Sequence, residues 1–112
     1  MRGWIGVDLD GVLAEHEGSM GEIIGRPIRP MVVRVKEWIT SGREVRVFTA
    51  RACDPRQVPA IKLWLEAQGL GGLSVTNVKD FDMVELYDDR AVRVKRNTGY
   101  ICGGCYRMKR GG

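Results

Sequence analysis

A short apolar run that ends in two carboxylates constrains the fold of this chain more than any other feature. Residues 4–7 (WIGV) lead into Asp8, Leu9 and Asp10, and Gly11 follows directly. An apolar run of this length is typical of a buried strand in a parallel sheet. Because side chains two residues apart on a strand point to the same side, we expect Asp8 and Asp10 to face the same way. Gly11 allows the chain to turn sharply after them.

Two like charges at the end of a buried strand need a chemical explanation. They repel each other and resist removal from water. The arrangement becomes favourable when a divalent cation binds between them, or when one carboxyl holds a proton. Magnesium fits, because this hard ion prefers carboxylate and carbonyl oxygens together with water. A strand that ends in an ordinary solvated turn is the alternative, and the rest of the chain has to decide between the two.

The remaining pattern predicts an α/β fold. The length of 112 residues is typical of one domain with its own core. We expect helices from Pro30 to Ile39 and from Asp54 to about Gln68, strands at 44–49, 73–77 and 85–89, a turn or short helix at 82–84, and an edge strand at 91–94. This alternation predicts a Rossmann-like, mainly parallel sheet flanked by helices.

Two further segments complete the single domain, which we expect to span residues 1–112. Residues 14–29 have neither helical nor strand periodicity, so we expect a loop or small hairpin that leans over the end of the first strand. This flap is too short for a separate cap domain, which would need about 50 residues. Residues 97–99 are expected to turn the chain into a C-terminal strand and a basic tail at 100–112.

The topology predicts where functional groups gather. In a parallel sheet they collect at the carboxyl ends of the strands. Asp8, Asp10, Thr49, Lys79 and Asp88 all lie at or just after predicted strand ends, although they are far apart in the sequence. We therefore expect the fold to bring them together.

These residue types fit phosphoryl transfer, which needs a nucleophile, a proton donor, a charge clamp and a metal. Asp8 is the candidate nucleophile, and Asp10 is the candidate general acid and base. The hydroxyl of Thr49 can donate a hydrogen bond to a phosphoryl oxygen. Lys79 can supply a compact positive charge.

A Mg²⁺ site follows from the same arrangement. Asp88, with Asp89 beside it, would complete the site together with Asp8 and Asp10, the latter through its backbone carbonyl. The sequence leaves open which of Asp88 and Asp89 is the direct ligand.

The four strand-end stretches resemble, in order, the four motifs of the haloacid dehalogenase-like superfamily. They are Asp8-Leu9-Asp10, Phe48-Thr49-Ala50-Arg51, Val78-Lys79-Asp80 and Asp88-Asp89-Arg90. The resemblance implies a magnesium-dependent phosphomonoester hydrolase that works through an aspartyl-phosphate on Asp8. It also implies that Thr49, Ala50, Arg51 and Lys79 bind the substrate phosphate. Because Lys79 lies unusually close to the fourth motif, Lys62 or Arg51 remains an alternative source of the positive charge.

The short flap resembles that of the capless members of this superfamily, including small bacterial and phage proteins, which commonly act on large substrates. The stretch from Thr49 to Arg51 is also similar to the phosphatase domain of polynucleotide kinase-phosphatases. A net charge of +4 favours anionic partners. Two alternatives therefore stay open: a nucleotide or nucleic-acid-end phosphatase, and a phosphate- or nucleic-acid-binding module with little turnover.

The remaining features point to no further function. No run approaches the ~20 apolar residues of a membrane span and no signal peptide is visible, so we expect a cytoplasmic protein without a membrane partner. His16 is expected to be solvated on its loop. Cys102 and Cys105 have the spacing of half a zinc site, but two glycines between them also suit a plain turn. A redox role is disfavoured because the motif is not expected to open a helix. The sequence does not indicate an oligomeric state.

Overall fold

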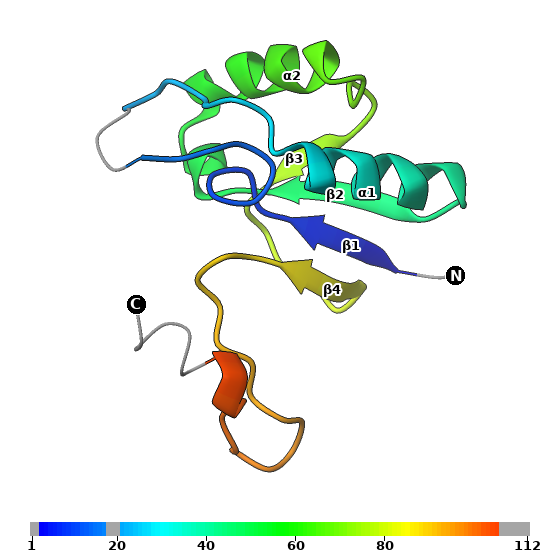
Figure 1. Ribbon diagram of the computed structural model, residues 1–112, viewed down its shortest axis with the longest axis vertical. Coiled ribbons are helices and arrows are strands. Elements are labelled where there is room, and N and C mark those ends of the chain that lie inside the picture. Colours follow the sequence, from blue (N-terminus) through cyan, green and yellow to red (C-terminus); the bar gives the residue numbers. More distant parts are fainter. Residues whose placement is uncertain (1–2, 18–20, 106–112) are drawn as a thin grey trace.

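The fold is a four-stranded parallel sheet with helices packed against it (Figure 1). The computed structural model describes residues 3–17 and 21–105. The strands are β1 Trp4–Val7, β2 Glu44–Phe48, β3 Ser74–Thr76 and β4 Met83–Tyr87. Their order is β3-β2-β1-β4, and each neighbouring pair runs parallel. The predicted α/β class is confirmed.

Two helices follow the first two strands. Helix α1 spans Arg29–Thr40, with Pro30 in its first turn, where the missing N–H costs nothing. Helix α2 spans Val58–Ala67. The second helix begins later than predicted, because the chain first forms the short 3₁₀ turns η1 Ala50–Cys53 and η2 Pro55–Gln57. Asp54 caps η2, since its side chain accepts a hydrogen bond from the backbone N–H of Arg56.

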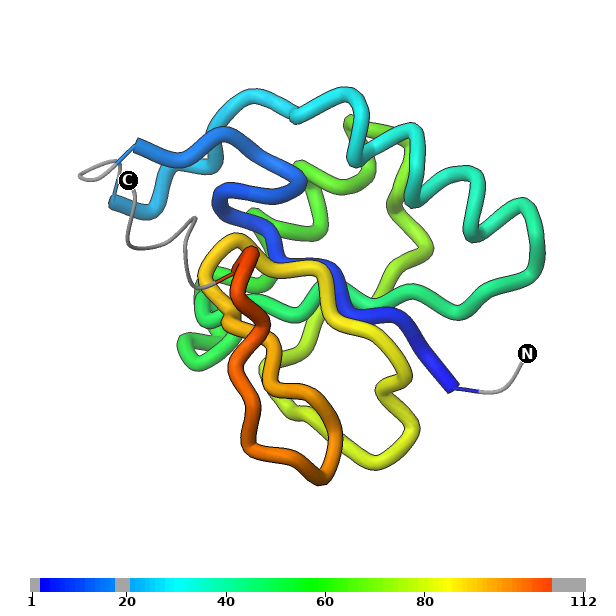
Figure 2. The backbone as a smooth tube through the Cα atoms, turned by 60° about the horizontal axis from the view of Figure 1, so that its bottom comes forward, coloured from blue at the N-terminus to red at the C-terminus, as the bar shows by residue number. Residues whose placement is uncertain are grey.

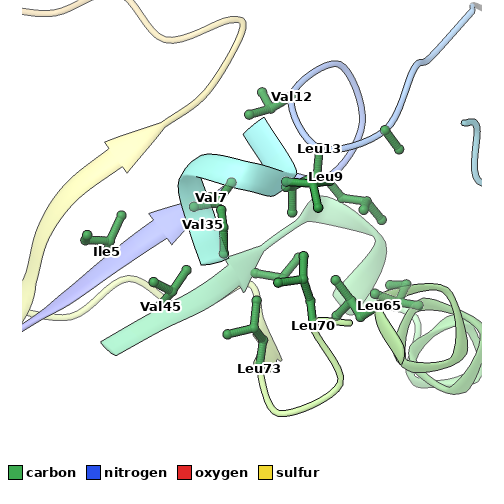
Figure 3. Close-up of a cluster of buried hydrophobic side chains, with 14 residues drawn as sticks. Ile5, Val7, Leu9, Val12, Leu13, Val35, Val45, Leu65, Leu70 and Leu73 are labelled. Atoms are coloured by element: carbon green, nitrogen blue, oxygen red, sulfur yellow. The ribbon is translucent and has the colours of Figure 1, made fainter. Parts of the chain in front are cut away.

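The hydrophobic core lies between the sheet and these two helices (Figure 3). Alternate strand residues enter it from one face of the sheet and meet apolar side chains of both helices. These core residues are Ile5, Val7, Val45 and Val47 from the strands, Val32 and Val35 from α1, and Ile61 and Leu65 from α2. Burial of each contributes roughly 1.5–3 kcal/mol, and it places β1 at the centre of the molecule.

The opposite face of the sheet is covered by side chains and by the β3–β4 connection. Trp4 is buried there: its indole N–H donates to Asp80 Oδ1 at 2.8 Å, and the Arg46 guanidinium lies 4.4 Å from the ring centroid. Residues 77–82 connect β3 to β4 without a helix. The predicted turn at 82–84 is therefore only partly correct, because β4 already begins at Met83.

The C-terminal part differs most from the sequence prediction. Strand β4 ends at Tyr87, so Asp88 and Asp89 follow the strand instead of lying within it. The edge strand predicted at 91–94 is wrong: β4 is the last strand of the sheet, and the only pairing described here is an isolated antiparallel bridge between Val94 and Ile101. Strand propensity alone does not make a strand without a neighbour to pair with.

Residues 90–105 instead form an arm on the β4 side of the sheet (Figures 1 and 2). The predicted turn is present, with positive φ at Asn97 and Gly99. The strand predicted from residue 100 onward is not formed, since residues 103–105 are helical. The tail at 106–112 lies outside the described residues.

The two ends of the flap pair with each other, as in a small hairpin, with an antiparallel bridge between Ala14 and Pro27. The backbone N–H of Glu15 donates to the carbonyl of Arg26 at 2.8 Å, and that of Ile28 donates to the carbonyl of Leu13 at 2.7 Å. Residues 18–20, which belong to this segment, lie outside the described residues. None of the helices in the described part of the chain has the length and apolar character needed to cross a membrane.

Candidate active site

A cavity of about 420 Å³ opens at the carboxyl ends of the strands. Its lining comes from the ends of all four strands and from the flap. The lining residues are Asp8, Asp10, His16, Phe48, Thr49, Ala50, Asn77, Asp88, Asp89 and Arg90. The structure thus brings together most of the residues predicted for the site, because parallel strands end at one edge of the sheet.

Three carboxylates form the centre of this site. Asp8, Asp88 and Asp89 each offer an oxygen, and these oxygens lie within 4.8 Å of one another. A backbone hydrogen bond of 2.9 Å from Asp8 N–H to the carbonyl of Tyr87 joins the ends of β1 and β4. The Oδ1 of Asp88 also accepts the backbone N–H of Arg90 at 2.6 Å, which fixes the turn after β4.

Gly11 makes room for this cluster. Its φ is +85°, a conformation that side chains rarely adopt, and a Cβ added there would lie 2.5 Å from the Asp89 carboxylate. The glycine that the sequence predicts for a sharp turn therefore has a second role, since it lets an acidic side chain lie against the backbone.

Asp8 is crowded by negative charge. The pKa of its carboxyl is raised to about 7, chiefly by burial and further by the charges of Asp88 and Asp89 and a hydrogen bond with Asp89. The backbone N–H of Leu9, 2.8 Å from Asp8 Oδ1, opposes this shift. The crowding predicted between Asp8 and Asp10 thus arises instead between Asp8 and the two aspartates after β4, and it favours either a proton or a cation between these carboxylates.

Asp10 has a different partner. Arg51 donates from Nε to Asp10 Oδ2 at 2.8 Å and from Nη2 to Asp10 Oδ1 at 2.9 Å. The Arg51 side chain is buried, and its remaining contacts are to the flap carbonyls of Glu22 at 2.8 Å and Ile23 at 3.0 Å. Arg51 was predicted to bind the substrate phosphate, but its guanidinium is directed to Asp10 and the flap, and Arg51 does not line the cavity.

Thr49 lines the cavity and also helps to position Arg51. It is buried at the end of β2, and its Oγ1 accepts the backbone N–H of Arg51 at 3.2 Å, which begins η1. A hydroxyl that accepts from the backbone still has its own proton to donate. Thr49 thus keeps a hydrogen-bond donor at the cavity wall, beside Ala50.

Lys79 is not brought to the cavity. It lines a separate hollow with Asp80 and Phe81, because the helix-free connection after β3 carries it away. Lys62, the alternative, is exposed on α2 and is also absent from the cavity lining. The cavity wall instead contains Asn77 just after β3 and Arg90 after β4.

Sequence reasoning missed Asn77 and Arg90, although Asn77 follows its strand as Thr49 follows β2. It also expected His16 to be solvated. The structure places His16 Nδ1 3.5 Å from Asp10 Oδ1, at the cavity wall. The only local signal for these three residues is polarity next to a strand end or in the flap.

The structure brings three of the four predicted metal ligands together. In the described ranges, the one group of three or more side chains suited to hold an ion is Asp8, Asp88 and Asp89. Asp10 was predicted to contribute its backbone carbonyl and does not belong to this group of side chains; both of its side-chain oxygens are held by Arg51. The three carboxylates fit a hard divalent cation such as Mg²⁺, whose preferred ligands are oxygens.

Comparison with known proteins supports the fold. No family model and no curated protein matches the chain. Among solved structures, a conserved protein from Bacteroides thetaiotaomicron is similar, with a TM-score of 0.64 and 22% sequence identity over 99% of this chain and 92% of that chain. At this level of identity the likeness shows a shared fold and carries no statement about activity.

Proposed function

We propose that the protein is a magnesium-dependent phosphomonoester hydrolase of the haloacid dehalogenase-like type. The observation that carries this proposal is the meeting of Asp8, Asp88 and Asp89 within 4.8 Å at the end of the central strand, with Asp10 two residues further on. Repulsion among the three carboxylates is the feature that a divalent cation relieves. Magnesium bound there would offset negative charge on the transferring phosphoryl group.

The chemistry uses two carboxylates in turn. An oxygen of Asp8 bonds to phosphorus while the phosphorus–oxygen bond of the ester breaks, and Asp10 gives a proton to the leaving oxygen. Water then attacks phosphorus, Asp10 takes up a proton from that water, and the bond to Asp8 breaks to release phosphate. The two hydrogen bonds from Arg51 hold Asp10 in one orientation, and one of them has to give way when Asp10 carries the proton.

The cavity wall offers donors for the phosphate oxygens. Thr49 has a free hydroxyl proton, Asn77 has an amide, and Arg90 is the cationic side chain among the lining residues. We assign the positive charge of the phosphate site to Arg90 in place of Lys79, since Lys79 lines a different hollow. Arginine can bind two oxygens of a phosphate at once.

A nucleotide or phosphorylated nucleic-acid end is the substrate class that we favour. The net charge of +4 attracts polyanions, and the described flap is a loop and not a domain that encloses a small molecule. The other alternative, a binding module with little turnover, is disfavoured because Asp8 and Asp10 supply both reactive groups.

The test is hydrolysis of an aryl phosphate with added magnesium, followed by a panel of sugar phosphates, nucleotides and oligonucleotides phosphorylated at either end. We expect turnover that requires magnesium, loss of turnover in Asp8→Asn, and a preference for oligonucleotides that shrinks as salt rises. Asp82→Asn is the matched control, because the same change falls on an exposed turn away from the cavity. Wild-type rates in Asp8→Asn would contradict the assignment of the nucleophile.

A further inference from the structure

The two cysteines of the C-terminal arm form a pair whose setting differs from that expected. Residues 103–105 are helical, so the Cys102-Gly-Gly-Cys105 stretch does open a helical turn. The backbone N–H of Cys102 donates to the carbonyl of Arg93 at 2.8 Å, which fixes its place on the arm. Both thiols are free and partly exposed, so a reagent in solution can reach them.

The surroundings of Cys102 favour its thiolate form. Its pKa is lowered, first by hydrogen bonds from the backbone N–H and then from the side chain of Cys105, and further by the N–H of Gly104 and the charge of Arg93. Thiolates, and not thiols, attack disulfides. Cys102 directly precedes the helical residues 103–105, so Cys105 lies one turn away, on the same side as Cys102.

The two glycines between the cysteines are not packed against other atoms. A Cβ added at Gly103 or Gly104 would meet no atom within 4 Å. A disulfide requires specific dihedral angles, and a turn of two unhindered glycines can adjust to them at little cost.

A metal site is a poorer explanation for the pair. Structural zinc has four ligands, which are cysteine or histidine in most sites. Within residues 3–17 and 21–105, the only group of three or more potential ligand side chains is the acidic cluster at the cavity, and neither Cys102 nor Cys105 belongs to it. The pair thus lacks a third ligand in the described part of the chain.

We propose that Cys102 and Cys105 are a redox site that a low-molecular-weight disulfide, such as glutathione disulfide, converts to an intramolecular disulfide. The Cys102 thiolate attacks one sulfur of glutathione disulfide, forms a mixed disulfide and releases one glutathione thiolate. Cys105 loses its proton to that thiolate, and its sulfur attacks Cys102 and releases the second glutathione. Two protein thiols are oxidised and one disulfide is reduced to two thiols. This inference does not depend on the proposed phosphatase activity.

The test uses the full chain equilibrated with glutathione buffers of increasing oxidised fraction, then alkylated with iodoacetamide and analysed by mass spectrometry. We expect alkylatable thiols to fall from three to one, with a peptide that links Cys102 to Cys105. Cys53→Ser, the control, should still close the same disulfide. Cys105→Ser should stop at a glutathione adduct on Cys102, because no second thiol can displace glutathione.

Several outcomes would overturn the proposal. They are three free thiols at every buffer ratio, disulfides only between molecules, preferential modification of Cys53, and purified protein that carries zinc on the two thiols. In the wild type, the thiol count together with the mass of the unreduced monomer and the peptide that links Cys102 to Cys105 separates closure from its absence, so the result does not depend on how well any variant folds.

Discussion

Asp8 and Asp10 lie two residues apart at the end of one strand, yet their neighbours have opposite charge. Asp8 meets two further carboxylates from the end of β4, and its pKa rises to about 7. Asp10 meets the buried guanidinium of Arg51, which binds both of its oxygens. The chemistry of Asp8 and Asp10 is therefore set by the segments that the fold brings to each of them.

The two aspartates would also have different roles in the proposed reaction. Crowded carboxylates need a cation, which suits the side of the site where phosphorus would bond to Asp8. The carboxylate of Asp10 accepts two hydrogen bonds from one guanidinium and therefore keeps a fixed orientation. A fixed orientation suits a group that must transfer a proton to or from a defined atom. A proton on Asp10 would replace one hydrogen bond from Arg51, so proton transfer and the ion pair are coupled.

After the loss of turnover expected in Asp8→Asn, the largest effect is expected from Asp10→Asn, which keeps the shape of the side chain and removes its ability to carry a proton. We predict a loss of about 10²–10⁴-fold in kcat, the range of general acid and base catalysis. Single-turnover rates across pH measure it. A rate equal to that of the wild type at every pH would remove Asp10 from the reaction.

Arg51→Met removes the positive charge that binds Asp10. It leaves Asp10 without its partner and frees the flap carbonyls of Glu22 and Ile23. We predict a loss of about 2–3 kcal/mol in the free energy of unfolding, measured with urea, since removal of one partner from a largely buried ion pair is costly. Arg56→Met is the control: its pair with Asp54 is exposed, so stability should barely change. Equal effects of the two substitutions would contradict this account.

The raised pKa of Asp8 predicts a pH dependence of stability without divalent cations. Between the unfolded value of 3.8 and the folded value of about 7, only the folded state holds the proton, so stability falls as pH rises through this window. After allowance for partial exposure, we expect a decrease on the order of 1–2 kcal/mol. Urea unfolding in a chelator at several pH values measures it. The free energy of unfolding of Asp8→Asn should stay constant across this pH window. A wild-type protein that becomes more stable as pH rises there would contradict the crowding of negative charge around Asp8.

The smallest effect is expected at Lys79. Because Lys79 lines a separate hollow, Lys79→Ala should leave kcat and KM close to those of the wild type. Arg90→Ala, at the cavity wall, should raise KM for a phosphate ester, since it removes the cation that we assign to the phosphate. If Lys79→Ala raised KM and Arg90→Ala did not, the positive charge of the phosphate site would belong to Lys79.

The sequence was sufficient where a residue's role depends on its place at a strand end. Asp8, Thr49 and Asp88 reach the cavity for this reason, because a parallel sheet aligns its carboxyl ends whatever the details of its loops. The order of apolar runs and helix signals likewise predicts the α/β fold.

The sequence was insufficient where a role depends on how a connection runs. The cavity position predicted for Lys79 is wrong because the β3–β4 connection lacks a helix. The orientation of Arg51 depends on a contact with the flap, which shows no periodicity in the sequence. The failed strand at 91–94 has suitable residues but no neighbouring strand. These outcomes follow from tertiary contacts, which local patterns do not contain.

The pairing of β1 with β4 has a consequence for how the molecule assembles. Trp4 and Asp80, joined across this edge, are 76 residues apart in the chain. During synthesis on the ribosome, β1 emerges before β4, and this edge of β1 has no partner strand until β4 has been made. Docking of β4 is also the event that brings Asp88 and Asp89 against Asp8. Completion of the sheet therefore gathers like charges beside Asp8.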